Sequence, residues 1–317
     1  MYFCGMNVRN DSSNPGVTVV IPVYNRAGQV RGTVTDIVLQ TRPPEAIVLV
    51  DNASTDNTAQ VLEALAAEAA SRGIPCKVLS EPEPGAPAAR NRGLAAVETE
   101  WVMFFDSDDN MLAGHIERAM RCAADNPDAE IIGWDVVWRD VSGKVRVMPF
   151  EYKDVEYHNL MHGTLATQRY MARTSLVRGA GAWNNRMRIW DDIELGARLL
   201  KSGPKIVKAN GKPQVIVNGQ VDSISGDRFS SRQGLYSAPL QAIAESLGAG
   251  RLKWVLLKAM ILAGDFAREG AGAEATSCRT AVIAAAQNRR QRMLLKFAYF
   301  YQSHGGRATA RLLRHLI

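Results

Sequence analysis

The chain has 317 residues, a formal net charge of +6 and four cysteines, a size that allows one large domain with an extension. The cysteines lack metal-ligand spacing, and no apolar run reaches the roughly 18 residues of a membrane-spanning helix. Unpaired thiols are typical of the reducing cytoplasm, and the cations belong to no nucleic-acid motif, which disfavours a nucleic-acid-binding protein.

Apolar runs alternate with helical patterns over the first 130 residues. We predict strands at 17–23, 46–50, 76–79 and 101–105, and helices at 29–40, 54–73 and 86–96. The first strand is rich in β-branched residues, whereas Val30, Val34 and Ile37 recur at the spacing of one helical face. This alternation predicts an α/β fold with a mostly parallel sheet flanked by helices, preceded by a loose tail at 1–16.

Polar side chains follow three of the predicted strands. Asn25 comes after the first strand, Asp51 and Asn52 follow the second, and Asp106 and Asp108 follow the fourth. Because the carboxyl ends of parallel strands meet at one edge of a sheet, where ligands bind, one site can collect these side chains.

Three carboxylates, Asp106, Asp108 and Asp109, follow the apolar run 101–105. Uncompensated carboxylates beside a buried strand repel one another and lose hydration, so a cation or strong donors usually hold them. We predict Mg²⁺ or Mn²⁺ at Asp106 and Asp108, because these ions prefer oxygen ligands and take further ligands from phosphates. Asp109 is predicted to cap a helix at 110–124.

Four segments lie at the ends of the predicted elements or between them. They read V-V-I-P-V-Y-N at 19–25, V-D-N-A-S-T-D at 50–56, P-G-A-P-A-A-R-N-R-G at 84–93 and D-S-D-D at 106–109. In this order they resemble the successive motifs of family-2 glycosyltransferases of the GT-A fold. Each alone is a modest signal, but four in the right order and spacing are a strong one. The resemblance covers residues 17–235. It implies a nucleotide-sugar-binding half at 17–130 and an acceptor-side half at 131–236. Residues 237–317 lie beyond it, and their Ala-rich helical pattern predicts a helical extension.

The resemblance implies that the first two loops hold the nucleotide of a UDP- or dTDP-sugar donor. The expected contacts are Pro22, Tyr24 and Asn25 in the first loop and Asp51 and Asn52 in the second. Many relatives carry two acids where this chain has Asp51 and Asn52. The amide oxygen of Asn52 can still accept the N3 proton of a pyrimidine base.

The same resemblance gives roles to Arg90 and to the acidic motif. Arg90 is expected to pair with Asp51 or to reach a donor phosphate, for which a guanidinium is well shaped. Without the neighbouring motifs, Arg90 would be interpreted as an ordinary surface arginine. Asp108 is the expected direct metal ligand, bridging the cation to the diphosphate. Asp106 is expected to orient that shell or contact the ribose, and Ser107 lies between them in the donor-binding loop.

A second acidic pair, Asp191 and Asp192, begins a helical pattern at 190–200 and resembles the acceptor-side acids of the family. In an inverting transfer, a base removes the proton of the acceptor hydroxyl while the metal stabilises the departing nucleoside diphosphate. Asp192 is the expected base, and Asp191 is the neighbouring acid that raises its proton affinity. The residues alone also allow both acids to complement the positive end of a helix.

The acceptor-side half is predicted to contain one strand at 131–138, with Trp134 and Trp138 on the same face. Such aromatics stack on sugar rings or fill a core, and a core position is expected for at least one of them. Gln220 stands where relatives often carry a histidine that ligates the metal. The sequence therefore leaves a third protein ligand open.

The resemblance thus implies an inverting glycosyltransferase acting on a saccharide or lipid-linked acceptor in polysaccharide biosynthesis. The alternative is a non-catalytic nucleotide-sugar-binding or scaffold protein of the same fold. Residues 237–317 carry 12 Lys plus Arg against 4 Asp plus Glu, a balance of +8 that leaves −2 on residues 1–236. A basic helical segment with aromatics fits the inner face of an anionic membrane. It fits equally well packing on the catalytic domain or on a homodimer partner.

Overall fold

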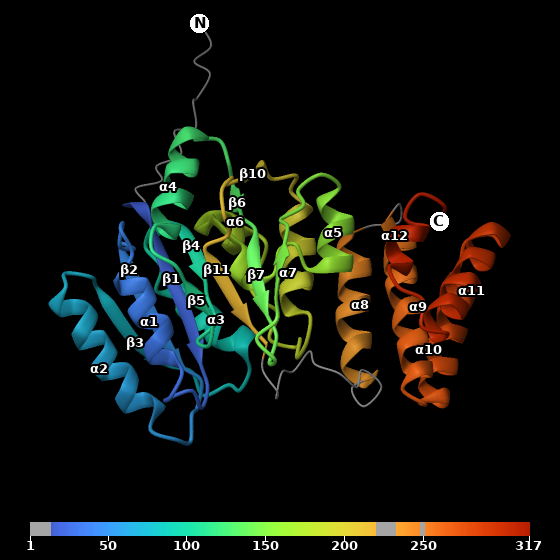
Figure 1. Cartoon of the computed structure of the whole chain (residues 1–317), viewed down its shortest axis with the longest axis horizontal. Coiled ribbons are helices and arrows are strands. Elements are labelled where there is room, and N and C mark those ends of the chain that lie inside the picture. Colours follow the sequence, from blue (N-terminus) through green and yellow to red (C-terminus); the bar gives the residue numbers. More distant parts are fainter. Residues whose placement is uncertain (1–13, 220–232, 248–250) are drawn as a thin grey trace, which may run out of the picture.

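The computed structural model describes residues 14–219, 233–247 and 251–317, which form two sheets and a group of C-terminal helices (Figure 1). The seven-stranded sheet has the spatial order β10 (Ile206–Lys208), β6 (Ile131–Gly133), β9 (Tyr170–Arg173), β4 (Thr99–Phe104), β1 (Asn14–Val23), β2 (Ala46–Asp51) and β3 (Cys76–Ser80). The four-stranded sheet has the order β5 (Asn110–Met111), β11 (Val215–Asn218), β7 (Val136–Arg139) and β8 (Val145–Met148).

The helices of the first two thirds of the chain belong to the part that contains the sheets, and those that follow form the extension (Figure 1). The former are α1 (Val30–Val38), α2 (Thr58–Ser71), α3 (Ala86–Ala95), α4 (His115–Asp125), α5 (Val155–His162), the 3-10 helix η1 (Thr167–Arg169), α6 (Thr174–Gly179) and α7 (Asp191–Leu200). The latter are α8 (Gln233–Leu247), α9 (Leu252–Arg268), α10 (Gly272–Ala285), α11 (Arg289–Ser303) and α12 (Thr309–Leu313).

The larger sheet is mostly parallel, as predicted. β1 pairs in parallel with β2 and β4, β2 with β3, and β6 with β10, whereas β9 runs antiparallel between β4 and β6. The predicted α/β fold with flanking helices and a helical extension is confirmed. β1 already begins at Asn14, so residues 14–16, predicted as part of the loose tail, belong to a strand.

β1 is buried on both faces, and its successive side chains enter different cores. Val19 and Ile21 pack beneath α1, α2 and α4, whereas Val20 packs beneath α3, α6 and α7. This division follows from the two-residue period of a strand. Each such side chain stabilises the fold by about 1.5–3 kcal/mol when fully buried.

α7 is buried on two sides. Leu195 and Leu199 pack into the core of the sheet, whereas Ile193 and Ala197 pack against the C-terminal helices. The helix that begins with Asp191 and Asp192 is therefore held between the sheet and the extension.

The helix predicted at 110–124 is wrong at its beginning, and Asp109 does not cap it. Asn110 and Met111 form β5, which pairs antiparallel with β11, and α4 starts only after Gly114, whose φ is 83°. Asp109 instead accepts a hydrogen bond from the backbone N–H of Asn218 in β11, at 2.7 Å. The pairing with a distant strand outweighs the local helical pattern.

The strand predicted at 131–138 is also wrong, because it divides into β6 and β7, which belong to different sheets. At the break, the Asp135 carboxylate accepts the backbone N–H of Phe150 at 2.6 Å. Trp134 is fully buried, with its indole N–H donating to the carbonyl of Gln168 at 2.8 Å. Trp134 is thus the core residue expected of the pair, and Trp138 lies in the smaller sheet.

The extension is a helical bundle in which α9 packs against α10 and α11. α11 lies at the outer end of the molecule, away from the sheets (Figure 1). Within the three described ranges, none of the helices combines the length and apolar character that a membrane crossing needs.

Candidate functional site

Acids from distant parts of the sequence meet at the guanidinium group of Arg90 in α3. Arg90 Nη2 donates to Asp106 Oδ1, just after β4, at 2.8 Å, and Nη1 donates to Asp191 Oδ2, at the start of α7, at 2.7 Å. Both charge-assisted bonds have the length typical of strong pairs. Arg90 therefore joins the carboxyl edge of the sheet to the start of α7.

Arg90 itself is only 5% exposed, and its guanidinium carbon lies 4.5 Å from the centroid of the Trp183 ring. Burial opposes the charge of Arg90, but Asp106 and Asp191 outweigh it and raise the pKa above its usual value. The expected pairing with Asp51 is wrong, and so is the interpretation of Arg90 as a surface residue. A buried guanidinium needs carboxylates close by, and α3 faces Asp106 and Asp191.

The two acids of the D-S-D-D motif that were predicted to bind metal differ in their contacts. Asp106 uses its second oxygen to accept a hydrogen bond from the side-chain amide of Gln168 in η1. Asp108 is paired loosely, with 3.7 Å between its Oδ2 and Arg26 Nε. Burial and the charge of Asp106 raise the pKa of Asp108, against the opposing effect of Arg26. Asp108 therefore carries negative charge that the protein leaves incompletely balanced.

The acids at the start of α7 differ in the same way. Asp191 is bound to Arg90, whereas Asp192 Oδ1 accepts only the backbone N–H of Ile193, at 2.8 Å, and forms no ion pair with a described residue. Burial and the charge of Asp191 hold the pKa of Asp192 well above the usual range of a carboxyl group. A carboxylate in this environment has the enhanced proton affinity of a general base.

The first two predicted loops are joined through Asn25. Its side-chain oxygen accepts the backbone N–H of Thr55 at 2.8 Å, and its own N–H donates to Ser54 Oγ at 3.0 Å. Asn25 has a φ of 48°, a left-handed conformation that asparagine tolerates well. Pro22 lies in β1 and Tyr24 is 56% exposed directly after it, so both lie at the same edge of the sheet.

Asn52 is buried, and its amide is fully engaged by the loop that leads into α3. Its oxygen accepts the backbone N–H of Gly85 at 2.8 Å, and its nitrogen donates to the carbonyls of Glu81 at 3.0 Å and Glu83 at 2.6 Å. Asp51, at the end of β2, is half-buried. The structure thus places both residues at the predicted edge, with Asp51 the more available of the two.

The contact of Gln168 with Asp106 and that of Trp183 with Arg90 were not predicted from the sequence. Trp183 is held over Arg90 by Asn91, whose side-chain amide accepts the N–H of Trp183 at 2.9 Å and donates to its carbonyl at 2.8 Å. Ser107, which lies between Asp106 and Asp108 in sequence, is buried. A tryptophan within an irregular Gly- and Asn-rich segment gives no periodic signal, so only the fold identifies it.

The residues fit a divalent cation that binds together with a phosphate-containing ligand. Among the described residues, no three or more His, Cys, Asp or Glu side chains form a ready-made metal cage. Asp106 has both oxygens engaged, so Asp108 is the carboxylate that can coordinate. One carboxylate suits Mg²⁺ or Mn²⁺, which keep several waters and take phosphate oxygens. Gln220, where a third ligand was left open, lies outside the described residues.

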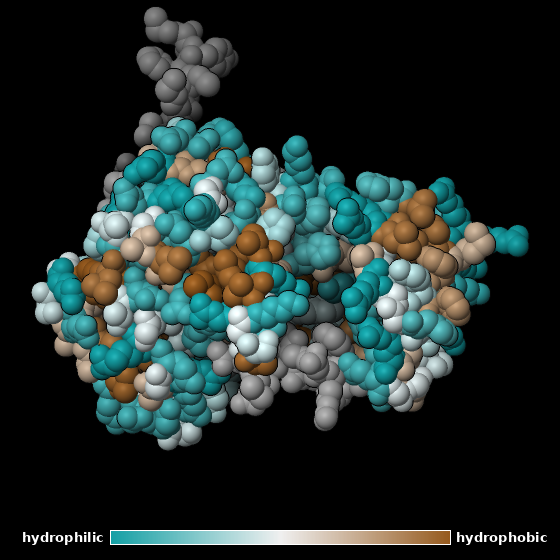
Figure 2. Space-filling view, viewed as in Figure 1, coloured by the Kyte–Doolittle hydropathy of each residue, from teal (hydrophilic) through white to brown (hydrophobic). Residues whose placement is uncertain are grey.

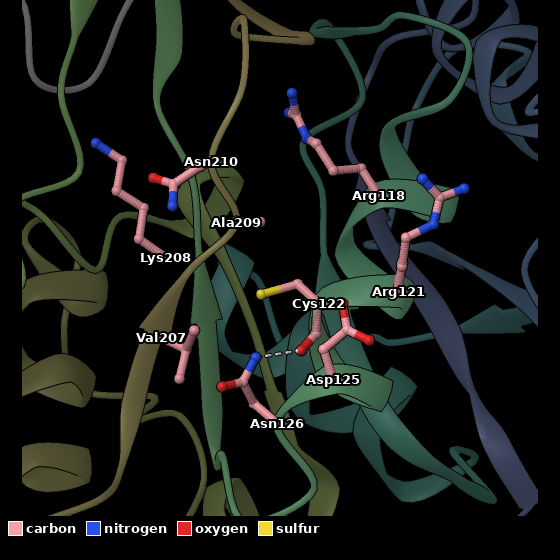
Figure 3. Close-up of a pocket in the computed structure, with 9 residues that line it drawn as sticks. All are labelled: Arg118, Arg121, Cys122, Asp125, Asn126, Val207, Lys208, Ala209 and Asn210. Carbon is pink, nitrogen blue, oxygen red and sulfur yellow. Dashed lines mark hydrogen bonds between the residues drawn. The ribbon is translucent and has the colours of Figure 1, made fainter.

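A surface pocket of about 450 Å³ lies between α4 and β10 and contains none of these residues (Figure 3). Its cations already have protein partners: Arg118 donates to the carbonyl of Lys212, and Lys208 lies 2.7 Å from Asp135. The pocket is therefore separate from the cluster of acids around Arg90.

Comparison with known proteins supports the family resemblance. The chain matches the model of glycosyl transferase family 2 over residues 18–190. TuaG of Bacillus subtilis, named for teichuronic acid biosynthesis, is 32% identical over 106 residues, which are 33% of this chain and 41% of TuaG. The chain spans less than half the length of the curated relatives it matches.

Two solved structures share the fold. Residues 1–349 of TarS from Staphylococcus aureus, in complex with UDP-GlcNAc, are 15% identical with a TM-score of 0.59, covering 94% of this chain and 91% of that chain. The mannosyltransferase PcManGT from Pyrobaculum calidifontis, in complex with GDP-Man and Mn²⁺, is 18% identical with a TM-score of 0.55, covering 92% and 82%. The predicted GT-A fold is thereby confirmed. Because the family model matches more than half of the chain and includes all four motifs, the chain belongs to glycosyl transferase family 2.

Proposed function

We propose that this protein is an inverting glycosyltransferase that moves a sugar from a nucleotide-diphosphate donor to a saccharide or lipid-linked acceptor in polysaccharide biosynthesis. The observation that carries the proposal is the meeting of two acidic pairs at Arg90. In each pair the first acid, Asp106 or Asp191, is hydrogen-bonded to Arg90. The second acid, Asp108 or Asp192, has no described cation within hydrogen-bonding distance.

On the donor side, Asp51 and the first-loop residues Pro22, Tyr24 and Asn25 would contact the nucleotide of a UDP- or dTDP-sugar. Asp108 would hold Mg²⁺ or Mn²⁺, and such a cation, when bound, stabilises the negative charge of a diphosphate leaving group. Asn52 would act through the loop before α3, because its amide is engaged there.

On the acceptor side, Asp192 would take the proton of the attacking hydroxyl. The acceptor oxygen forms a bond to the anomeric carbon as the bond to the diphosphate oxygen breaks, and the electron pair leaves with the diphosphate. Asp191 would keep its bond to Arg90 and raise the proton affinity of Asp192 by its charge. Attack from the side opposite the leaving group inverts the anomeric configuration.

A panel of UDP-, dTDP- and GDP-sugars tests the proposal, with and without Mn²⁺ or Mg²⁺. We expect cation-dependent thermal stabilisation by a UDP- or dTDP-sugar. We also expect nucleoside diphosphate release that requires an acceptor, and a product whose anomeric carbon is inverted by NMR. Donor binding without release, across saccharide and lipid-linked acceptors, would favour the non-catalytic alternative. A product of retained configuration would refute the role of Asp192.

The extension is proposed to contact an anionic membrane through α11. Three large apolar side chains are exposed at helical spacing on this helix, Met293 (65%), Phe297 (45%) and Phe300 (58%). Figure 2 shows apolar side chains gathered on this C-terminal end of the molecule. α11 also carries Arg289, Arg290, Arg292 and Lys296 and has no acid. Exposed apolar groups with cations match an anionic lipid surface. A symmetric contact between two copies of α11 would set these cations against each other.

Co-sedimentation with vesicles of phosphatidylcholine and phosphatidylglycerol tests this contact. We expect binding that weakens with salt, and we expect it to be lost when Met293, Phe297 and Phe300 are all changed to Ser. Val145→Ser and Val147→Ser in β8 form the control, because each valine is 58% exposed. If the α11 variant and the β8 control bind vesicles equally, a membrane contact through these three side chains is excluded. A concentration-dependent dimer that the α11 variants abolish would assign the face to self-association.

A further inference from the structure

Trp190, the residue immediately before the acceptor-side acids, has an unusual backbone. Its φ of 55° and ψ of 24° lie in the left-handed region, which bulky side chains rarely adopt. Such a conformation is strained and persists only where surrounding contacts impose it. Trp190 immediately precedes α7, so the orientation of that helix and the positions of Asp191 and Asp192 depend on those contacts.

The contacts come from the C-terminal helices. The Trp190 ring lies 4.7 Å from the Tyr236 ring of α8, centroid to centroid. The ammonium nitrogen of Lys258, in α9, lies 4.7 Å from the centroid of the same ring. Lys258 also lies within 3.4 Å of the carbonyl oxygen of Met161 in α5, to which it donates. Trp190 is thus held by two helices that follow it in sequence.

Lys258 also brings positive charge close to the acids. The ionisable groups that face it are Asp192 from α7, Asp265 from its own helix and His162 from α5. Burial lowers the pKa of Lys258 to about 8, and the charges of Asp265 and Asp192 oppose this decrease. Asp192 in turn faces Asp191, Arg90, Asp106 and Arg169, as well as Tyr170 and Lys258.

We propose that Lys258 is a positioning residue for Asp192, acting through the Trp190 ring and through its own positive charge. This inference rests on the proposed function only in taking Asp192 as the general base. It assigns to the extension a part in the catalytic centre, although the family model ends at Trp190.

The test compares Lys258→Gln, Lys258→Arg and Lys253→Met with the unaltered chain. Gln can keep the hydrogen bond to Met161 but lacks the charge, and Arg keeps the charge over the ring. Lys253 is a matched control in the same helix, because its ammonium lies 4.5 Å from the Trp254 ring centroid and donates to the carbonyl of Ile317 at 3.3 Å.

We expect Lys258→Gln to lower kcat by about tenfold with an unchanged donor KM, less than the roughly 10²-fold that a 1 Å misplacement can cost. Lys258→Arg should restore kcat, and Lys253→Met should leave it unchanged. In the unaltered protein, kcat should fall as the pH rises through about 8, where Lys258 loses its proton. Lys258→Arg should remove that alkaline decrease, because a guanidinium stays charged.

A second measurement does not depend on turnover. Carboxyl ¹³C NMR titration, with the Asp192 signal assigned from Asp192→Asn, should show a higher Asp192 pKa in Lys258→Gln than in Lys253→Met. The proposal is overturned if the two variants agree in kcat and in the Asp192 titration. If no nucleotide sugar turns over, the proposed function fails, while the titration still decides whether Lys258 acts on Asp192. If Lys258→Gln does not fold, Lys258→Met is titrated in its place against the same control.

Discussion

The site contains two acidic pairs from different elements, Asp106 with Asp108 and Asp191 with Asp192. The two pairs have the same arrangement of contacts. In each pair the first acid is bound to Arg90, at 2.8 Å and 2.7 Å. The second acid of each pair has a raised pKa because of its burial and the charge of a neighbouring acid. One buried cation thus fixes the positions of both pairs without neutralising the two acids that remain.

The pairs differ in their surroundings. Asp108 lies at the edge of the sheet, and its only described ion pair is the long one to Arg26, at 3.7 Å. Its charge is thus incompletely neutralised, which suits an acid that is to bind a cation and a diphosphate. Asp192 lies between the sheet and the C-terminal helices, with no described ion-pair partner, which suits an acid that is to accept a proton. Position on the fold, rather than residue type, separates the two proposed roles.

The largest effect is expected from Asp108→Ala. We expect loss of cation-dependent donor binding and a decrease in transfer of about 10³-fold or more, because a bound cation is worth several kcal/mol. Calorimetric titration of UDP with Mn²⁺ measures the binding. Asp128→Ala is the control, since the Asp128 carboxylate pairs with Lys205 at the surface. Unchanged UDP affinity would mean that Asp108 is only structural.

Asp192→Asn should lower transfer by about 10²-fold or more while donor binding stays intact, because the amide cannot accept the proton. It should also raise the melting temperature at neutral pH. The folded-state pKa of Asp192 lies above its unfolded value, so stability is lost as pH rises through that window, and Asn avoids this loss.

Asp191→Asn should instead lower the melting temperature, because Arg90 loses a charged partner. Full activity of Asp192→Asn would move the role of base to another acid.

Arg90→Met should destabilise the fold by about 3 kcal/mol, the lower end for breaking a buried ion pair, because both carboxylates are partly exposed. Arg173→Met is the control, since Arg173 pairs with Glu100 and lies 5.0 Å from the centroid of the Trp101 ring. Chemical denaturation should show losses in both variants. Only Arg90→Met should reduce donor binding and transfer, and equal transfer by both would separate Arg90 from the site.

The pH dependence of transfer should report Asp192. Because its pKa is raised, kcat should fall by about tenfold for each pH unit below that pKa, at a pH where ordinary carboxyl groups are still ionised. The measurement is kcat against pH at saturating donor and cation. An acid limb near the usual carboxyl range would contradict the proposed base.

The smallest effect is expected from Arg26→Ala. The pair with Asp108 is long and the Arg26 side chain is 34% exposed, so it contributes no more than about 1 kcal/mol. Donor affinity should therefore change by less than about fivefold in a UDP titration. A much larger loss would indicate that Arg26 contacts the donor directly.

Local sequence patterns were sufficient for the parallel strands and for the edge at which polar residues gather. β-branched runs such as Val17–Val23 can be buried on both faces only in a sheet covered by helices. Asn25, Asp51 and Asp106 follow such runs, and the geometry of parallel strands then brings them to one edge. These features depend on neighbours in sequence and on the two-residue period of a strand.

The partners of Arg90, the strand at Asn110 and the placement of Trp190 depended on the tertiary structure. Arg90 meets Asp191, 101 positions away, and β5 pairs with β11, more than 100 positions away. Local patterns predicted a helix at Asn110 and a surface position for Arg90. They contain no information about which distant carboxylate pairs with a buried cation or which distant strand completes a sheet. The sequence by itself determined which residues can carry the chemistry, whereas the tertiary structure decided which acids are bound to Arg90 and which remain available.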